Sequence, residues 1–157
     1  VHWTFGTLNG RTWHEVAVAG AMCLVCTPVL LAHAGALNAF SAGGDDVAAS
    51  LGVAVARARI AITLAAVLSS AAIVSFTGVI GFVGLVAPHI ARLLIGGDHR
   101  ALLPFAAVVG ALLVLLADMA GRLLFAPVMV PVGIVVAFLG VPLFLHLLLT
   151  RRNEMSS

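Results

Sequence analysis

The sequence predicts an all-α protein that crosses a membrane several times, and three observations lead to this fold class. Hydrophobic residues make up 62% of the 157-residue chain and charged residues only 9%, whereas an ordinary soluble domain is about one quarter charged. The mean hydropathy is +1.21. The apolar residues gather in long stretches, and about 20 such residues form an α-helix that spans a bilayer. The chain therefore has room for about five membrane segments.

The first segment is predicted between Val16 and His33, with Pro28 as a kink or termination signal. Trp3 and Trp13 flank a polar stretch before it, as expected for residues at a membrane interface. Two later spans are predicted at about residues 102–124 and 132–149, and the loop between them contains Pro127 and Pro131.

A second apolar stretch runs without a charge from Ile60 to Pro88, which is too long for one straight span. We predict a helix that ends near Thr77, a glycine-rich turn, and a short helix over about residues 86–95 with Pro88 near its start. That short helix rises about 15 Å, half the thickness of a bilayer. Missing glycine side chains let backbones approach closely, and non-helical backbone at membrane depth needs a covering of protein or a water-filled path. The residues expected at this break in the translocation path are Gly78, Gly81, Gly84 and Pro88.

Between these apolar stretches lies a run of mostly small residues, which we call the linking segment (about residues 35–56). Asp45 and Asp46 favour the start of a helix and Gly52 favours its end, so a short helix is predicted between them. The residues alone leave two readings open, an ordinary loop and a docking element for a partner.

Arginine counting predicts the orientation. If the C-terminus is cytoplasmic, most arginines near the ends of spans face the cytoplasm and only Arg11 and Arg122 face outward. The arginines expected inside are Arg57, Arg59, Arg92, Arg100, Arg151 and Arg152. The formal net charge is +2 without a basic cluster, so nucleic acid is not an expected partner.

Several motifs, in order along the whole chain, resemble the FecCD-type permeases, the membrane-spanning subunits of ABC importers for iron–siderophore complexes, haem and cobalamin. The central match is the stretch from Gly78 to Leu94, followed by Gly96 to Pro104. The other matching residues are Trp3, Gly6-Thr7-Leu8, Trp13, Leu37-Asn38-Ala39-Phe40, Gly44-Asp45-Asp46-Val47-Ala48, Leu51-Gly52-Val53, Ala117-Asp118, Arg122, Pro131-Val132-Gly133 and Gly140-Val141-Pro142-Leu143-Phe144. Met129 stands where many members have a glutamate, which puts any docking role of that carboxylate in doubt.

The resemblance implies a partial type II ABC-importer permease fold in a bacterial inner membrane. The family's permeases are about twice as long, so residues 1–157 are expected to be the C-terminal half of one transmembrane domain, as a fragment or a split subunit. Implied partners are cytoplasmic ATPase subunits, a second permease copy or homologue, an extracytoplasmic substrate-binding protein and membrane lipid. The implied cargo is a ferric siderophore, with haem and cobalamin still open.

The resemblance also assigns roles to residues. The linking segment is expected to dock the ATPase through Asp45, Asp46, Ala48, Ser50, Leu51 and Gly52. Arg122 is expected to meet acidic residues of the binding protein, although it also lies four residues after Asp118, a spacing that favours a structural ion pair. No phosphate-binding G-x-x-x-x-G-K-[ST] loop occurs in these residues, so ATP hydrolysis is assigned to a partner and the chain is not expected to be an enzyme.

The remaining polar residues favour structural roles. His89 has no histidine or carboxylate at a ligand spacing, so neither a metal site nor another cofactor is expected. Cys23 and Cys26 lie in an apolar helix pattern and are interpreted as small apolar side chains. An ion-coupled secondary transporter is the alternative function, but it should carry ionisable residues near mid-span and the predicted spans have none there. An intramembrane protease would need a serine motif such as G-x-S-x-G, which does not occur.

Overall fold

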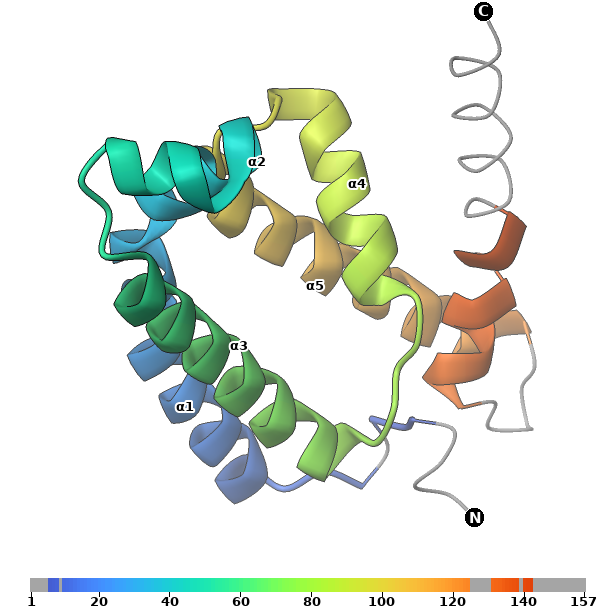
Figure 1. Cartoon of the computed structure of the whole chain (residues 1–157). Helices are drawn as coiled ribbons and strands as arrows, with labels where there is room; N and C mark the ends of the chain where they lie inside the picture. The colour runs from blue at the N-terminus through green and yellow to red at the C-terminus, as the bar shows by residue number, and fades with distance from the viewer. Residues whose placement is uncertain (1–5, 9, 125–130, 139, 143–157) are drawn as a thin grey trace, which may run out of the picture. The chain divides into compact units, whose positions relative to one another are not determined.

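The computed structural model describes residues 6–8, 10–124, 131–138 and 140–142; most of these residues are helical and none of them lies in a strand (Figure 1). Its helices are α1 (Trp13–Ala32), α2 (Ala34–Ser50), α3 (Val55–Thr77), α4 (Val83–Ile95) and α5 (His99–Leu124). Residues 132–138 and 140–142 are also helical. The all-α prediction is confirmed.

Three of the described helices are long and apolar enough to cross a membrane: Trp13–Ala32, Val55–Thr77 and His99–Leu123. The predicted end of the second long helix at Thr77 is confirmed, and so is a separate, shorter helix after it. Some sequence predictions lie outside the described residues. These concern Trp3, the loop at residues 125–130 with Met129, residues 143–149 of the last span, and Arg151 and Arg152.

The chain divides into two compact units. The first comprises residues 1–9, 77–94 and 105–157, and the second comprises residues 10–76 and 95–104. Helix α5 therefore begins in the second unit and continues into the first, so it is a covalent link between them.

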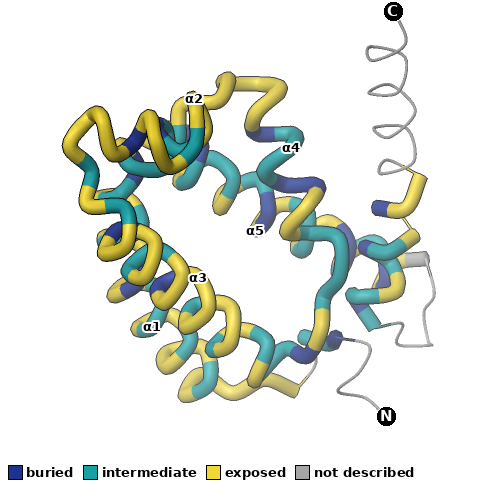
Figure 2. Tube along the Cα trace, in the orientation of Figure 1, coloured by how far each residue is buried: buried dark blue, intermediate teal, exposed yellow. Residues whose placement is uncertain are grey.

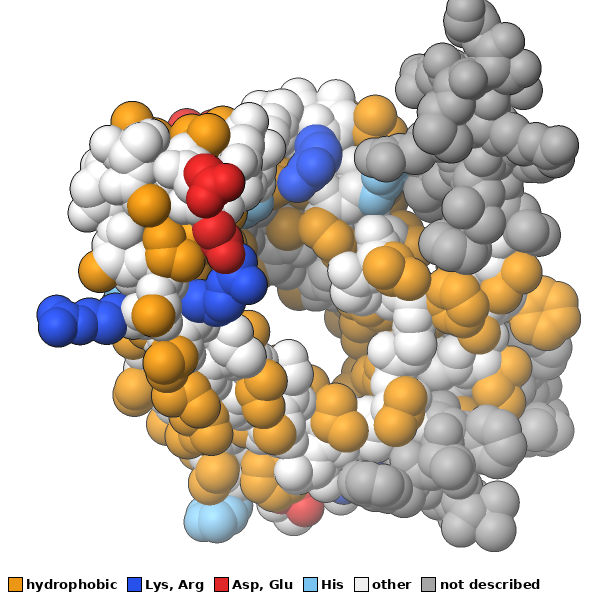
Figure 3. All heavy atoms as spheres, in the orientation of Figure 1, with side chains coloured by type: hydrophobic (Ala, Val, Ile, Leu, Met, Phe, Trp, Pro, Cys, Tyr) orange, Lys and Arg blue, Asp and Glu red, His pale blue; other side chains and the backbone are white. Residues whose placement is uncertain are grey.

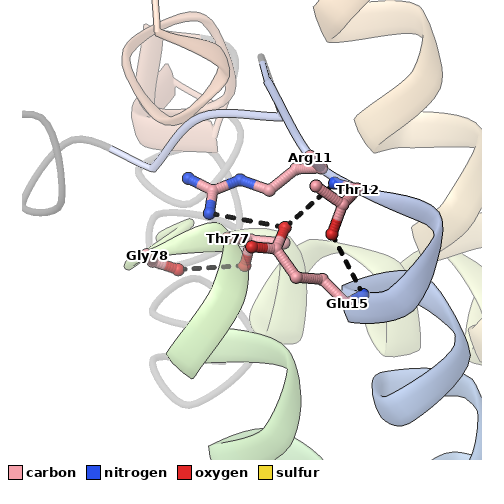
Figure 4. A network of polar contacts seen from close by, with 5 residues as sticks. All are labelled: Arg11, Thr12, Glu15, Thr77 and Gly78. Carbon is pink, nitrogen blue, oxygen red and sulfur yellow. Dashed lines mark hydrogen bonds and ion pairs between the residues drawn. The ribbon is translucent and has the colours of Figure 1, made fainter.

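In the second unit, α1 begins with a capping box. The backbone N–H of Glu15 donates to Oγ1 of Thr12 at 3.4 Å, and the backbone N–H of Thr12 donates to Oε2 of Glu15 at 3.1 Å. The Arg11 guanidinium lies 3.9 Å from the same carboxylate (Figure 4). Pro28 lies inside α1 and does not end it; the helix ends at Ala32, next to the predicted end of the span at His33.

Small residues form the core of the second unit, and large apolar residues face outward. Figure 2 shows α1 and α3 exposed along most of their length. Exposed fractions reach 76% at Leu24 and 60% at Ile60. This is the pattern of helices that pack through small side chains and present large ones to lipid. The buried residues of this unit are Cys26, Ala34, Ala39, Ala48, Ala58, Ala65 and Leu102.

In the first unit, an apolar cluster forms around the helix that begins at Val132. Its buried members are Ala117, Val132 and Val136. The partly buried residues packed against them are Ile80, Phe82, Val83, Val114 and Val135. The segment after α3 is therefore part of this core. The backbone N–H of Thr7 donates to the carbonyl of Thr77 at 2.8 Å, and the backbone N–H of Gly133 donates to the carbonyl of Gly6 at 3.3 Å. Residues 6–7 thus connect the end of α3 to the helix that begins at Val132.

Candidate functional site

The linking segment is more helical than the sequence predicts. Helix α2 covers residues 34–50, but its backbone leaves helical geometry at Gly43 (φ −172°, ψ 23°) and Gly44 (φ 74°, ψ −155°). The conformation of Gly44 is open essentially to glycine alone. At Gly43, an added Cβ would lie 2.3 Å from Cγ2 of Val47. The two glycines therefore divide α2 into a first half, residues 34–42, and a second half, residues 45–50.

The second half of α2 is the predicted short helix, and it ends as predicted at Gly52. Gly52 has a φ of 83° and donates to the carbonyl of Ala49 at 3.0 Å, while Val53 donates to the carbonyl of Ala48 at 3.0 Å. This pair of bonds is the Schellman motif, in which a glycine with positive φ satisfies the last carbonyls of a helix. Nearby residues thus set both ends of this short helix: the Gly43–Gly44 break precedes it and Gly52 follows it.

Exposure separates the residues that were predicted to contact a partner. Asp45, Asp46, Ser50, Leu51 and Gly52 are exposed, and Leu51 is exposed to 67%. Ala48 is fully buried in the second unit, so it packs inward and does not form part of the exposed surface. A partner would therefore meet the acidic residues, Ser50 and Leu51 first.

An ion pair joins the second half of α2 to the start of α3. Arg59 donates through Nη2 to Oδ1 of Asp45, and its guanidinium carbon lies 5.7 Å from the centre of the Phe40 ring. Figure 3 shows acidic and arginine side chains together over α2 and the start of α3. The sequence analysis missed this pair, because Asp45 and Arg59 are 14 residues apart and belong to different helices.

A second connection joins the first half of α2 to the start of α5. Oδ1 of Asn38 accepts from the backbone N–H of His99 at 2.8 Å and lies 2.7 Å from Nδ1 of the same residue. Nδ2 of Asn38 donates to Oδ1 of Asp98 at 2.7 Å. Asp98 is exposed, and this bond, with one from the backbone N–H of Arg100 at 3.0 Å, holds the pKa of its carboxyl below the ordinary value. Sequence reasoning placed Asn38 in a matching motif without giving it a role.

These connections gather arginines at one end of the second unit. Arg59 pairs with α2, Arg57 lies two residues before it in the first turns of α3, and Arg100 follows the Asn38 contact. An added Cβ at Gly35 would lie 3.9 Å from Nη2 of Arg100, so that guanidinium lies beside α2. That these three arginines face the cytoplasm stays a prediction.

The helix break after α3 lies in the first unit. Gly78 has a φ of 74° and Phe82 a φ of 66°, so the chain turns sharply between α3 and α4. The carbonyl of Phe82 accepts from Leu85 (3.1 Å) and Val86 (2.9 Å), which starts α4 earlier than predicted. Pro88 consequently lies inside α4 rather than near its start.

The predicted close packing at Gly81 and Gly84 is not found among the described residues. An added Cβ at either glycine would meet nothing within 4 Å. The tight positions are instead Gly6, where a Cβ would lie 2.6 Å from the Val79 carbonyl oxygen, and Gly140, where it would lie 2.5 Å from Cβ of Phe82. Sequence spacing could not identify these contacts, since each glycine is far from its neighbour along the chain.

The predicted pair near the end of α5 is formed. Nε of Arg122 donates to Oδ2 of Asp118 at 2.7 Å. The Arg122 side chain is 56% exposed and the Asp118 side chain 21%. Asp118 therefore depends on the pair more than Arg122 does, and the guanidinium keeps an exposed edge.

The remaining candidates do not assemble a reactive site in the described part of the chain. His89 is partly buried, and its Nε2 has no hydrogen-bond partner among the residues that the structure describes. Cys23 and Cys26 are free thiols. Among the described residues, no group of three or more His, Cys, Asp or Glu side chains could hold a metal ion. Three long apolar helices with exposed large side chains, and the short helix α4 that follows α3 after a turn, define the class of protein: a polytopic helical membrane protein.

The family follows from comparison with known proteins. A model of the FecCD transport family matches residues 1–150. The chain belongs to the FecCD transport family.

Curated relatives are similar over nearly the whole chain. It is 43% identical over 149 residues to a probable siderophore transport system permease protein of Bacillus subtilis, covering 95% of this chain and 43% of the relative. It is 42% identical over 154 residues to the hemin transport system permease protein of Yersinia pestis, covering 98% and 46%. It is 44% identical over 151 residues to the cobalamin import system permease protein of Halobacterium salinarum, covering 96% and 40%.

A solved structure is similar as well. It is described as an inward-facing conformation of a putative metal-chelate type ABC transporter, with a TM-score of 0.83 and 34% identity. The match covers 93% of this chain and 48% of that one. The chain thus spans less than half the length of each relative named here.

Proposed function

We propose that this chain forms part of the permease of an ATP-driven importer, with its linking segment docked on a separate cytoplasmic ATPase. The observation that carries the proposal is the family match over residues 1–150, since the relatives are named as import or transport permeases. The chain would then line part of the path, and its partner would hydrolyse ATP.

The geometry of the linking segment supports docking. The second half of α2 presents Asp46 and Leu51 on its surface, and the Arg59 pair and the Schellman motif hold its two ends. A preorganised helix loses less conformational entropy on binding than a mobile loop does. An exposed apolar residue beside acidic ones fits a partner cleft with an apolar floor and a basic rim.

The arginine distribution supports a cytoplasmic position for this end. Arg59 pairs with Asp45 of α2, Arg100 lies beside Gly35 of α2, and Arg57 belongs to the first turn of α3. An excess of arginine marks the cytoplasmic side of short loops. The same alternation would place the C-terminus in the cytoplasm and Arg122 on the outer side. We assign Arg122 to docking of an extracytoplasmic binding protein, and we expect a second permease copy or homologue to complete the path.

A metal chelate is the proposed cargo class, with ferric siderophores favoured. The relatives are named for siderophore, hemin and cobalamin transport, all of which involve bulky metal complexes. The break at Gly78–Phe82 and α4 would border the path, because α4 is too short to cross a bilayer alone.

ATP dependence tests the proposal against an ion-coupled transporter. The assembled transporter would be reconstituted in liposomes, and uptake of a ferric hydroxamate complex, ferric citrate, haemin and cobalamin would be measured. We expect uptake of at least one of these to require ATP and to survive ionophores that collapse proton and sodium gradients. Uptake that stops with the ionophores and continues without ATP would overturn the proposal.

A further inference from the structure

The Asn38 contact is unusual because it is not needed to start α5. Asp98 already caps this helix: its side chain accepts from the backbone N–H of Arg100 at 3.0 Å, and its carbonyl accepts from Leu102 at 2.8 Å. Asn38 takes the additional N–H of His99 and binds the capping carboxylate itself. These bonds therefore connect two elements 60 residues apart rather than nucleate a helix.

The connection lies on one side of the diglycine break, and the Arg59 pair lies on the other. The first half of α2 is fastened to α5 through Asn38, and the second half is fastened to α3 through Asp45. Gly43 and Gly44 separate the two attachments. A displacement of the second half that moves the first half through this junction would therefore reach α5 through Asn38.

The anchored helix leads out of the unit. Helix α5 begins among residues of the second unit, and from Phe105 onward it belongs to the first unit, which also contains α4 and the Asp118–Arg122 pair. Helix α5 contains Pro104, which has no backbone N–H to donate, but the helix continues past it to Leu124, so a displacement of its first turn is passed on to the rest of the helix. Asn38 is thus the side chain through which α2 is held to a helix that reaches the other unit.

We propose that Asn38 is a positioning residue that fastens the linking segment to the start of α5, so that a movement imposed on the segment is transmitted along α5. The inference rests on the proposed function, because an ATPase must supply the movement. In this account Asn38 keeps α2 and α5 together in every state of the cycle.

The test measures whether the two elements stay together. With Cys23 and Cys26 replaced by alanine, spin labels would be placed at Ser41→Cys and Ala101→Cys, two exposed positions on α2 and α5. Their distance distribution would be measured by pulsed electron paramagnetic resonance in the assembled transporter, without nucleotide and after trapping with Mg-ATP and vanadate. We expect one narrow distribution in both states.

Asn38→Ala should broaden this distribution or shift it between the two states. It should also lower the amount of ferric hydroxamate complex transported per ATP hydrolysed on the order of fivefold, the scale of a lost coupling between sites. Ser69→Ala is the matched control, because the bonds that its hydroxyl makes to described residues are those to the carbonyls of Ala65 and Ala66 in its own helix. A merely structural role would lower the yield of transporter and leave both the distance and the transport-to-hydrolysis ratio unchanged.

Exchanging the residue types at positions 38 and 98 separates loss of this hydrogen bond from a general failure of the chain to assemble. Asn38→Asp places a carboxylate against Asp98, whereas the double variant Asn38→Asp, Asp98→Asn restores a donor opposite an acceptor and retains a capping residue. We expect the double variant to recover the narrow distribution that Asn38→Asp loses. An unchanged distribution in Asn38→Ala, or no recovery in the double variant, would overturn the inference, whereas a wild-type chain that does not assemble with an ATPase would overturn the proposed function instead.

Discussion

Phe82 and Gly140 lie in direct contact in the first unit, so closely that a Cβ on Gly140 would come within 2.5 Å of Cβ of Phe82. Phe82 also has a positive φ of 66°, which is rare for a residue with a side chain. The turn between α3 and α4 therefore contains a strained residue, Phe82, and the space for its side chain is left by the glycine at position 140.

Gly140→Ala should lower the stability of the chain by roughly 1–3 kcal/mol, because the new methyl group would force Phe82 or its backbone to shift. Thermal unfolding of the purified protein in detergent measures this. Gly20→Ala in α1 is the control, since a Cβ there meets nothing within 4 Å and alanine favours a helix. Equal unfolding temperatures for Gly140→Ala and the wild type would show that the contact is not tight.

The break in α2 gives a second prediction. Gly44→Ala should destabilise the chain by roughly 1–3 kcal/mol, because its φ of 74° and ψ of −155° are closed to other residues. Gly43→Ala should be harmful for a different reason, a collision with Val47, so Gly43→Ala with Val47→Ala should recover part of the loss. Thermal unfolding of the four variants distinguishes strain from collision. Recovery of Gly44→Ala by Val47→Ala would contradict the assignment.

The lowered pKa of Asp98 predicts a dependence on pH. A carboxyl with a lowered pKa contributes stability above its unfolded pKa, and this contribution is lost as the pH falls through the folded value. Asn38→Ala removes the largest cause of the shift, so the pKa of Asp98 should rise towards its ordinary value. The stability difference between wild type and Asn38→Ala should shrink as the pH is lowered past about 3.9. A difference that stays constant over that range would show that the bond does not favour the charged carboxylate.

The Asp118–Arg122 pair separates a structural role from docking. An exposed i,i+4 pair of this kind contributes little to stability, so Arg122→Ala should cost little of it. If the exposed guanidinium docks a binding protein, Arg122→Ala should weaken that association, more strongly at low salt because exposed charges are screened at high salt. Affinity would be measured in nanodiscs at two salt concentrations. Unchanged affinity, with full recovery of stability by Asp118→Asn, would leave Arg122 a structural residue.

Local signals in the sequence identified much of the fold. Charge-free stretches located the long helices, Thr77 was correctly predicted as the end of one of them, and the acidic start and Gly52 predicted the second half of α2. These features are encoded within a few residues of one another. The contacts of Asn38 with Asp98 and of Gly140 with Phe82 depend on tertiary packing across large sequence separations, so no local pattern revealed them.

The packing of other predicted site residues also depends on tertiary structure. Gly81 and Gly84 were expected to be tightly packed because glycines at that spacing often allow close approach of helices, yet no atom of the described residues lies within 4 Å of a Cβ added at either. The family resemblance placed Ala48 in the docking segment, and the structure buries its side chain within the second unit. Its role in docking stays a prediction. Whether the remaining residues of that surface dock an ATPase is still a prediction.

Cross-linking of Leu51→Cys to the ATPase tests the central claim most directly. Cys23 and Cys26 would first be replaced by alanine, and Leu24→Cys, on the outward face of α1, would be the control because it is 76% exposed and belongs to a span. With cysteines introduced along the ATPase cleft, we predict an oxidative cross-link from Leu51→Cys and none from Leu24→Cys. A Leu51→Cys chain that forms no cross-link to the ATPase, and that a membrane-impermeant thiol reagent labels from outside the cell, would contradict both the docking role and the orientation.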